Sequence, residues 1–191
     1  LYRPVCNQVI NHDPDISLIP PRAPTLFTLR LAGSSQTGNQ TLRGRLFIAC
    51  RPINLSSKKQ ALQELAQRAA DITGAQERAI FDVLLERERL GTTGVGNGIA
   101  IPHGKLAQLE QLQGMFARLE TPVDFESIDE QPVDLIFLLL APEEAGADHL
   151  KALARVSRLL RDKNMCEKLR GTEEADALFA LLSDSAHSNA A

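Results

Sequence analysis

The sequence predicts a single α/β domain in which a mixed β-sheet is flanked by helices on both faces. Apolar residues recur at helical spacing in segments such as 62–72 and 150–160. A nearly unbroken apolar run at 133–140 is typical of a central strand that is buried on both of its faces. The chain has 191 residues, 43% of them apolar, which is long enough for one such domain with residues left over.

We expect this domain to span residues 44–184. Residues 1–43 contain scattered Pro, Asn, Ser, Thr and Gly, and their apolar residues follow neither a helical nor a strand period. This composition predicts a disordered N-terminal extension, since it offers little apolar surface to bury. Residues 185–191 are expected to be a frayed C-terminal tail.

The first half of the domain is expected to supply a strand and two helices. An apolar run at 46–50, bounded by charged residues, predicts the strand. Ser57 and Gln60 have the spacing of a capping box at a helix start, and Gly74 is placed to end that helix. A second helix is expected at about 75–90.

The second half is expected to add more strands and then mainly helices. Thr172 is expected to cap the last helix, because Glu173 and Glu174 would then lie in the first turn and suit the helix dipole. The expected strands are 115–119, a short edge strand at 121–125, and 133–140; the expected helices are 149–160, 165–169 and 172–182.

Composition argues against several classes of protein. A net charge of −3 and only eight aromatic residues, none of them Trp, argue against a nucleic-acid binder. Cys6, Cys50 and Cys166 are widely spaced and odd in number, so we expect reduced thiols and no zinc site. No apolar run approaches the about 18 residues of a membrane span, and no compact apolar run marks a signal peptide. We expect a cytoplasmic protein with no membrane insertion, metal or other cofactor.

The most informative stretch runs from Arg87 to Gly104. Four glycines within eight residues precede a short apolar run, after which Pro102 presents His103. A glycine costs roughly 0.5–1 kcal/mol relative to Ala inside a helix or strand, so this density indicates positive φ or close approach of the backbone. Pro102 favours an extended conformation at the residue before it, which predicts His103 at a strand end. We expect Gly104 to leave the imidazole uncrowded.

A lone loop histidine is more often a surface residue than a functional one, but the glycine-rich stretch and Pro102 before His103 favour a functional imidazole.

Other known motifs are not matched by this sequence. Ile99 stands where a dinucleotide-binding loop needs its third glycine, and Lys105 is not followed by the Ser or Thr of a P-loop. No H-E-x-x-H or G-x-S-x-G pattern supports a metalloprotease or a serine hydrolase. His12 and His187 carry no structural signal.

The amino-acid sequence of this stretch is distinctive. Gly-Asn-Gly-Ile-Ala-Ile-Pro-His-Gly-Lys at 96–105, preceded by Arg-Glu-Arg-Leu-Gly-Thr-Thr-Gly at 87–94, resembles the IIA domain of the bacterial phosphoenolpyruvate-dependent phosphotransferase system. The resemblance is to the fructose/mannitol type, and within it to the nitrogen-regulatory branch. It covers about residues 57–184 and not the first forty-odd.

This resemblance implies roles for two histidines. His103 would accept the phosphoryl group as a tele-phosphohistidine, that is, on its Nε2 atom. His149, in a His-Leu-x-x-Leu sequence after an acidic loop, would hydrogen-bond the phosphoryl group or orient the first imidazole. Without the resemblance, His149 would be a polar residue in the first turn of a helix.

Three further residues are weaker candidates. Arg87 holds the first position of the family's Arg-Glu-x-x-Gly and would neutralise phosphoryl oxygens, with Arg89 as the rival and a solvated helix charge as the alternative. Glu86, Glu88 and Arg89 are expected to include such solvated charges. Thr93 and Asn97 are candidates either to donate hydrogen bonds to phosphate or to brace the loop.

The resemblance implies a phosphoryl carrier rather than a free-standing turnover enzyme. Its donor would be an HPr-like phosphocarrier protein. In a regulatory protein, the phosphorylation state controls binding to targets of potassium or nitrogen homeostasis. In a sugar-transport component, the phosphoryl group passes to a IIB domain during fructose or mannitol uptake. The residue sequence of the motif, and the lack of a IIB or membrane IIC segment, favour a regulatory protein over a sugar-transport component. A binding module that has lost phosphorylation is a third alternative, disfavoured by the two histidines.

Overall fold

The computed structural model describes residues 25–31, 42–53 and 55–188. The strands are β1 (Thr25–Leu31), β2 (Leu42–Ile53), β3 (Gly94–Gly96), β4 (Ile99–Ala100), β5 (His103–Leu106), β6 (Leu112–Val123) and β7 (Val133–Pro142). The helices are α1 (Lys58–Thr73), α2 (Glu77–Arg89), α3 (Gly146–Arg161), α4 (Lys163–Gly171) and α5 (Ala175–Ser188), with a short 3₁₀ turn, η2 (Glu143–Ala145). None of the helices within these ranges has the length and hydropathy needed to cross a lipid bilayer.

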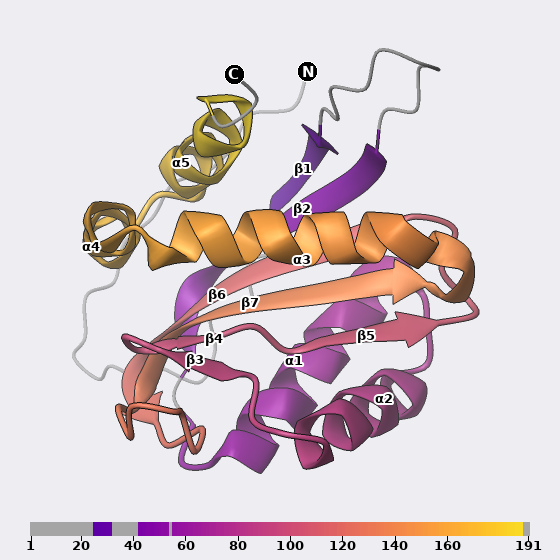
Figure 1. The fold of residues 1–191 in the computed structure, drawn as a ribbon, viewed down its shortest axis with the longest axis horizontal. Coiled ribbons are helices and arrows are strands. Elements are labelled where there is room, and N and C mark those ends of the chain that lie inside the picture. Colours follow the sequence, from indigo (N-terminus) through magenta and orange to yellow (C-terminus); the bar gives the residue numbers. More distant parts are fainter. Residues whose placement is uncertain (1–24, 32–41, 54, 189–191) are drawn as a thin grey trace, which may run out of the picture.

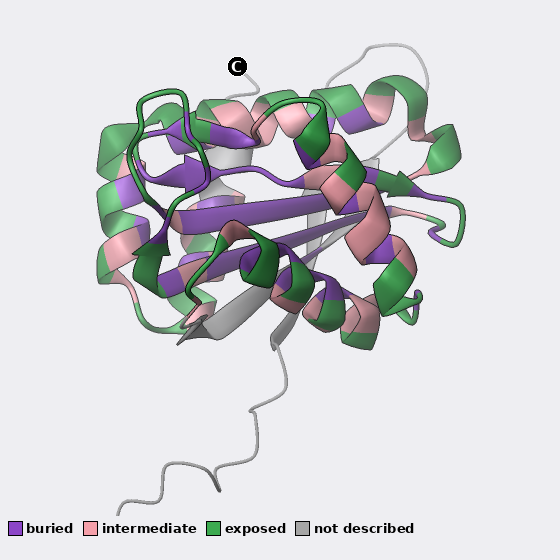
Figure 2. Cartoon of the chain, turned by 90° about the horizontal axis from the view of Figure 1, so that it is seen from below, coloured by how far each residue is buried: buried purple, intermediate pink, exposed green. Residues whose placement is uncertain are grey.

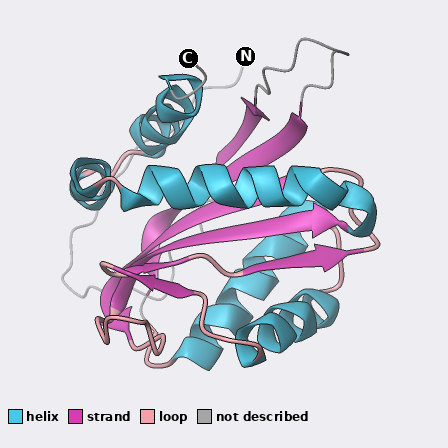
Figure 3. Cartoon of the chain, in the orientation of Figure 1, coloured by secondary structure: helices cyan, strands magenta, loops and turns pink. Residues whose placement is uncertain are grey.

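The seven strands form one mixed sheet in the order β1-β2-β6-β7-β4-β3, and β5 pairs with β7 beyond the end of β4 (Figure 1). The pairs β2–β6, β4–β7 and β5–β7 are parallel, whereas β1–β2, β6–β7 and β3–β4 are antiparallel. Helices α1 and α2 cover one face, and α3, α4 and α5 cover the other (Figure 3). The predicted α/β class, with helices on both faces of a mixed sheet, is confirmed.

Strand β7 shows why the sheet is buried on both faces. Leu138 and Leu140 belong to the apolar cluster beneath α1 and α2, and Leu135 and Phe137 belong to the cluster beneath α3, α4 and α5. Successive side chains of a strand point to opposite faces, so a strand covered on both sides must be apolar at nearly every position. Figure 2 shows the buried strands between the two helical layers.

Helix α1 begins with the predicted cap, in a modified form. The Ser57 hydroxyl accepts from the backbone amide of Gln60 at 3.3 Å. In a capping box the Gln60 side chain would accept from the amide of Ser57. Here it reaches one residue further back, and its Oε1 accepts from the amide and the hydroxyl of Ser56. Gly74 ends the helix with a φ of 73° and donates to the carbonyl of Ala70.

The expected disorder of residues 1–43 is wrong for 25–31, which form β1 and pair along their whole length with β2, and for 42–43, which begin β2. The sequence carries the reason, since Phe27, Leu29 and Leu31 alternate with Thr and Arg at the two-residue period of a strand. The stretches 1–24 and 32–41 lie outside the described residues, so the expectation remains a prediction there.

Three other expectations need correction. The separate edge strand at 121–125 does not form, because β6 continues to Val123, where it pairs with Val133 of β7. Thr172 closes α4 rather than capping α5, and its hydroxyl donates to the carbonyl of Lys168 at 2.7 Å. The expected frayed tail begins too early, because α5 continues to Ser188 without a Gly or Pro to stop it; residues 189–191 lie outside the described range.

Gly104 has a different role from the expected one. A Cβ atom placed there would lie 2.3 Å from Cγ1 of Val83, so the absence of a side chain lets β5 pack directly against α2. Glycine is required by this close approach and not to uncrowd the ring of His103. The contact fixes the distance between the strand that begins at His103 and the helix that carries Arg87.

Replacing Gly104 with Ala is expected to lower the free energy of unfolding by about 1–3 kcal/mol, because overpacking forces the strand and helix apart. In a Val83→Ala background the same replacement should cost less, since the clashing methyl group is gone. Gly171→Ala is the control, because nothing lies within 4 Å of a Cβ built there. Urea denaturation measures the free energy of unfolding of the unmodified chain, Gly104→Ala, Val83→Ala, the double variant and Gly171→Ala. An equal loss from Gly104→Ala with and without Val83→Ala would contradict the proposed packing contact.

Candidate functional site

His103 occupies the first position of β5, opposite Leu139 of β7, and its side chain is half-buried. Its Nδ1 atom lies 2.8 Å from the carbonyl oxygen of Ile101. A carbonyl oxygen only accepts, so Nδ1 carries the ring proton and donates it. The Nε2 atom therefore keeps its lone pair, and it accepts from Nε of Arg87 at 3.0 Å. Both ring nitrogens are engaged, and the tautomer is fixed.

Arg87 comes from the last turn of α2 and is held at a second point, where its Nη1 donates to the carbonyl of Gly91 at 3.0 Å. Its rival Arg89 is exposed. The structure thus brings Arg87, and not Arg89, to the imidazole. The positive-φ backbone at Gly91 turns the chain away from the helix and leaves its carbonyl free to accept from the guanidinium.

The environment of His103 favours the neutral imidazole. Burial is the main cause and lowers the pKa of His103 below its ordinary value of 6.5, and the Arg87 cation lowers it further. The hydrogen bond to the Ile101 carbonyl and the charge of Glu88 act in the opposite direction without reversing the shift. The ring is therefore largely uncharged at neutral pH, with Nε2 available as a base or a nucleophile.

His149 lies in the first turn of α3, and its ring centroid is 5.7 Å from that of His103, with 56° between the two planes. The residue is only 7% exposed, and its Nε2 atom is buried with no hydrogen-bond partner among the described residues. Burial, followed by the nearby His103 and Lys105, lowers the pKa of His149. The structure brings together the two histidines that the sequence singled out, and it leaves one buried nitrogen of the pair unsatisfied.

Thr93 braces the loop, which is one of the two roles considered for it. It is buried, and both its amide (3.1 Å) and its hydroxyl (2.6 Å) donate to the carboxylate of Glu88. With its hydroxyl committed in this way, Thr93 has no free donor to offer a phosphate.

Of the three charges considered as solvated, Glu86 and Arg89 are exposed, whereas Glu88 is buried. The residue is 8% exposed, and Nζ of Lys58 lies 3.3 Å from its Oε1 atom. A signal for this burial is present in the sequence, because Ile80, Leu84 and Glu88 are spaced by four and share the apolar stripe of α2. Glu88 and Lys58 are the residues that sequence reasoning missed.

Asn97 lies at the turn of the β3–β4 hairpin, away from His103. Its amide donates to Asp129 at 2.7 Å, and its carbonyl accepts from Arg170 at 2.9 Å. The next residue, Gly98, bonds to the amide of Leu135 on β7, whereas His103 pairs with Leu139 four residues further along, a separation of about 13 Å at the rise of a strand. The structure does not bring Asn97 to the histidine pair.

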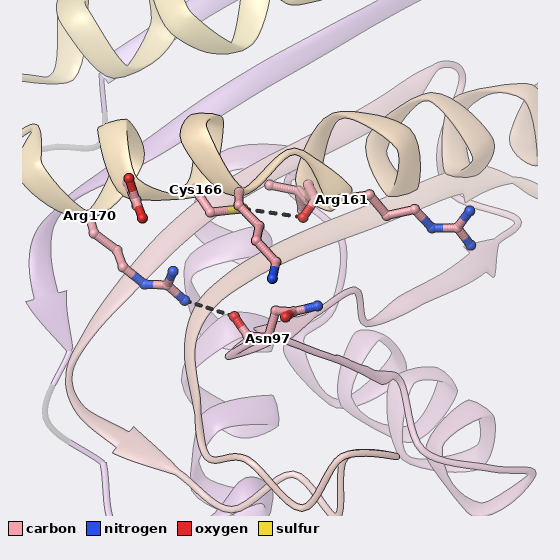
Figure 4. A pocket seen from close by; sticks show the side chains of 7 residues that line it. Asn97, Arg161, Cys166 and Arg170 are labelled. Atoms are coloured by element: carbon pink, nitrogen blue, oxygen red, sulfur yellow. Dashed lines mark hydrogen bonds between the residues drawn. The ribbon is translucent and has the colours of Figure 1, made fainter.

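A cavity of about 230 Å³ borders Asn97 at this distant end of the domain (Figure 4). One of its cationic side chains, Arg170, is neutralised by Asp134, to which it donates two hydrogen bonds, at 2.6 and 2.7 Å. The buried thiol of Cys166, on its wall, donates to the carbonyl of Leu160, and burial raises the pKa of that thiol. The remaining lining residues are Arg161, Lys163 and Glu167.

In the described part of the chain, no three His, Cys, Asp or Glu side chains gather as a metal site would require. The side chains of Cys50 and His187 are not described, and Cys6 and His12 lie outside the described residues. The candidate site therefore consists of two neutral imidazoles and a guanidinium, supported by the carboxylate of Glu88 behind the loop.

Comparison with known proteins gives consistent relatives. Residues 47–185 match the family "Phosphoenolpyruvate-dependent sugar phosphotransferase system, EIIA 2". A nitrogen regulatory protein of Bradyrhizobium diazoefficiens is 65% identical over 130 residues, covering 68% of this chain and 85% of that protein. The nitrogen regulatory protein of Escherichia coli is 41% identical over 133 residues, covering 69% and 82%. The crystal structure of nitrogen regulatory protein IIA-Ntr from Neisseria meningitidis superposes with a TM-score of 0.67 at 34% identity, covering 72% of this chain and 92% of that one.

Replacing Arg87 with Ala is expected to raise the pKa of His103, because a neighbouring cation that disfavours the imidazolium is removed. Arg89→Ala is the matched control, since it removes a cation from the same turn of α2 without touching the ring. An NMR titration of the His103 ring protons measures both. If His103 titrates at the same pH with and without Arg87, the assigned contact is contradicted.

Proposed function

Because this chain belongs to the EIIA type-2 family of the phosphoenolpyruvate-dependent sugar phosphotransferase system, we propose that it is a cytoplasmic regulatory IIA protein that carries a phosphoryl group on His103. The observation that carries the proposal is the state of the imidazole, whose Nδ1–H is bound to the carbonyl of Ile101 while Nε2 keeps its lone pair. A neutral imidazole with a directed lone pair is the nucleophile that phosphoryl acceptance needs.

The transfer balances without moving a proton. The Nε2 lone pair of His103 attacks the phosphorus of a phosphohistidine donor whose other ring nitrogen is protonated, and a new N–P bond forms. The donor's N–P bond breaks with its electron pair returning to the donor ring, which leaves as a neutral imidazole, while His103 keeps its proton on Nδ1. Arg87 has to leave the lone pair for this step, and its guanidinium then meets the phosphoryl oxygens. Such transfers depend mainly on positioning and on positive charge near those oxygens, and they use no metal or other cofactor from this chain.

His149 supplies a second donor to the phosphoryl group. Its buried Nε2 atom has no partner among the described residues, and a phosphoryl oxygen on His103 would provide one. A phosphoryl group carries about −1.5 to −2 charges near pH 7, so a nearby N–H stabilises it. The neutral state of His149 avoids charge repulsion with the first imidazole before the phosphoryl group arrives.

The donor is an HPr-like phosphocarrier protein that docks at this edge of the domain. Two large apolar side chains are exposed close to the catalytic residues in the chain: Leu90, 86% exposed, three residues after Arg87, and Leu150, 66% exposed, immediately after His149. Exposed apolar side chains beside a polar site suit a protein partner better than a small substrate.

The phosphorylation state is then the signal. The 65% identity to a nitrogen regulatory protein supports phosphorylation-dependent binding to proteins of nitrogen or potassium homeostasis.

The second candidate function is sugar transport, which the family's description supports. In that case the phosphoryl group passes to a IIB domain during fructose or mannitol uptake. Incubating the phosphorylated chain with a fructose-type or mannitol-type IIB domain separates the two: regulation predicts that the label stays on this chain, and rapid transfer to the IIB cysteine would favour transport.

His103→Ala is expected to abolish phosphorylation while leaving the fold intact. Because a half-buried ring and its two hydrogen bonds are lost, the free energy of unfolding should fall by about 0.5–3 kcal/mol, the usual range for one substitution. His149→Ala should still be phosphorylated at His103, but more slowly, by less than the roughly 10³–10⁵-fold effect of an arginine finger. Intact-mass measurement after incubation with the complete donor chain follows both variants. Phosphate retained by His103→Ala, or an acid-stable phosphate in the unmodified chain, would contradict the proposal.

A further inference from the structure

The last turn of α2 is connected to both ring nitrogens of His103, directly to Nε2 and indirectly to Nδ1. Arg87 contacts Nε2 directly, whereas its neighbour Glu88 points into the protein and takes no part in the proposed phosphoryl transfer. A carboxylate is buried at a high cost unless donors satisfy it, and Glu88 meets three: the amide and hydroxyl of Thr93, and Nζ of Lys58. So complete a set of donors holds the carboxylate, and with it Thr93, in one place.

From Thr93 the connection continues to the imidazole through the backbone. The carbonyl of Thr93 accepts from the amide of Ile101 at 2.9 Å, and the carbonyl of Ile101 accepts from Nδ1 of His103 at 2.8 Å. Glu88 thus fixes the segment between β4 and β5, which presents the acceptor for the ring proton. Without that acceptor, only the Arg87 donor at Nε2 would still favour the proton on Nδ1.

We propose that Glu88 is a positioning residue: through Thr93 and Ile101 it holds His103 as the Nδ1–H tautomer and so leaves Nε2 as the reactive atom. Its consequence for transfer rests on the function proposed above, but the tautomer does not. Separately from this role, the charge of Glu88 opposes the effect of Arg87 on the pKa of His103. Lys58 and Glu126, which form an ion pair at 2.8 Å, complete the charged groups around Glu88.

Glu88→Gln tests the proposal in the full chain. The replacement keeps the size of the side chain but loses the charge, and its one remaining oxygen replaces two acceptors. The ¹⁵N chemical shifts of the His103 ring at about pH 8, above its titration, report the tautomer directly. We expect distinct protonated Nδ1 and unprotonated Nε2 signals in the unmodified chain, and signals shifted toward each other in Glu88→Gln. Glu86→Gln, at an exposed site of the same helix, is the control and should leave them unchanged.

A second pair of variants guards against a Glu88→Gln protein that fails to fold. Thr93→Val removes the hydroxyl donor at nearly constant volume and should shift the ring signals in the same direction by a smaller amount, whereas Thr93→Ser should restore the original signals. Phosphoryl acceptance by Glu88→Gln should fall about ten-fold or more, as expected when a reacting group is misplaced.

The outcomes separate the two proposals. Ring signals that stay unchanged in both Glu88→Gln and Thr93→Val, with only thermal stability lowered, would make Glu88 a structural brace and overturn the inference. A chain that is never phosphorylated, yet shows the tautomer shift in Glu88→Gln, would overturn the proposed function and leave the positioning role standing.

Discussion

The hydrogen bond from Nδ1 of His103 to the carbonyl of Ile101 decides which nitrogen of the ring is available for chemistry. It forms between β4 and β5, where the Pro102 carbonyl still accepts from the amide of Leu139 on β7 while the Ile101 carbonyl faces the side chain of His103. On the other side of the ring, the close approach permitted by Gly104 brings α2 near enough for Arg87 to reach Nε2. The features of the site are consequences of how one strand is interrupted and packed.

Burial and charge act together to keep this site neutral until a phosphoryl group arrives. Burial is the main cause of the lowered pKa of both His103 and His149, and the two rings lie 5.7 Å apart. Two charged imidazoles at that distance would repel each other, so the pair is stable only if the rings are largely neutral. Arg87 is then the positive group nearest the reactive nitrogen, and the unsatisfied Nε2 of His149 is a ready donor.

Much of this was predictable from the sequence, whereas contacts between distant segments were not. Helices and strands with their own local signals, such as the cap at Ser57 and the apolar run of β7, were confirmed, and the family resemblance pointed to the histidines and Arg87 that the structure brings together. The contact of Glu88 with Lys58 and the separation of Asn97 from His103 could not be read from the sequence, because both depend on distant segments. The donor from Lys58 and the direction of the β3–β4 hairpin exist only in the folded sheet.

The central claim is that the fold leaves Nε2 of His103, and not Nδ1, as the phosphoryl acceptor. The position of the phosphoryl group on the ring tests it most directly. Heteronuclear ³¹P–¹⁵N–¹H NMR of the phosphorylated chain, selectively labelled in histidine, identifies the nitrogen that is bonded to phosphorus. The structure predicts a phosphorus coupling to Nε2 of His103 with the proton still on Nδ1, held by the Ile101 carbonyl. Phosphorus bonded to Nδ1 would contradict the account, because the hydrogen bond on which it rests would then have to be broken.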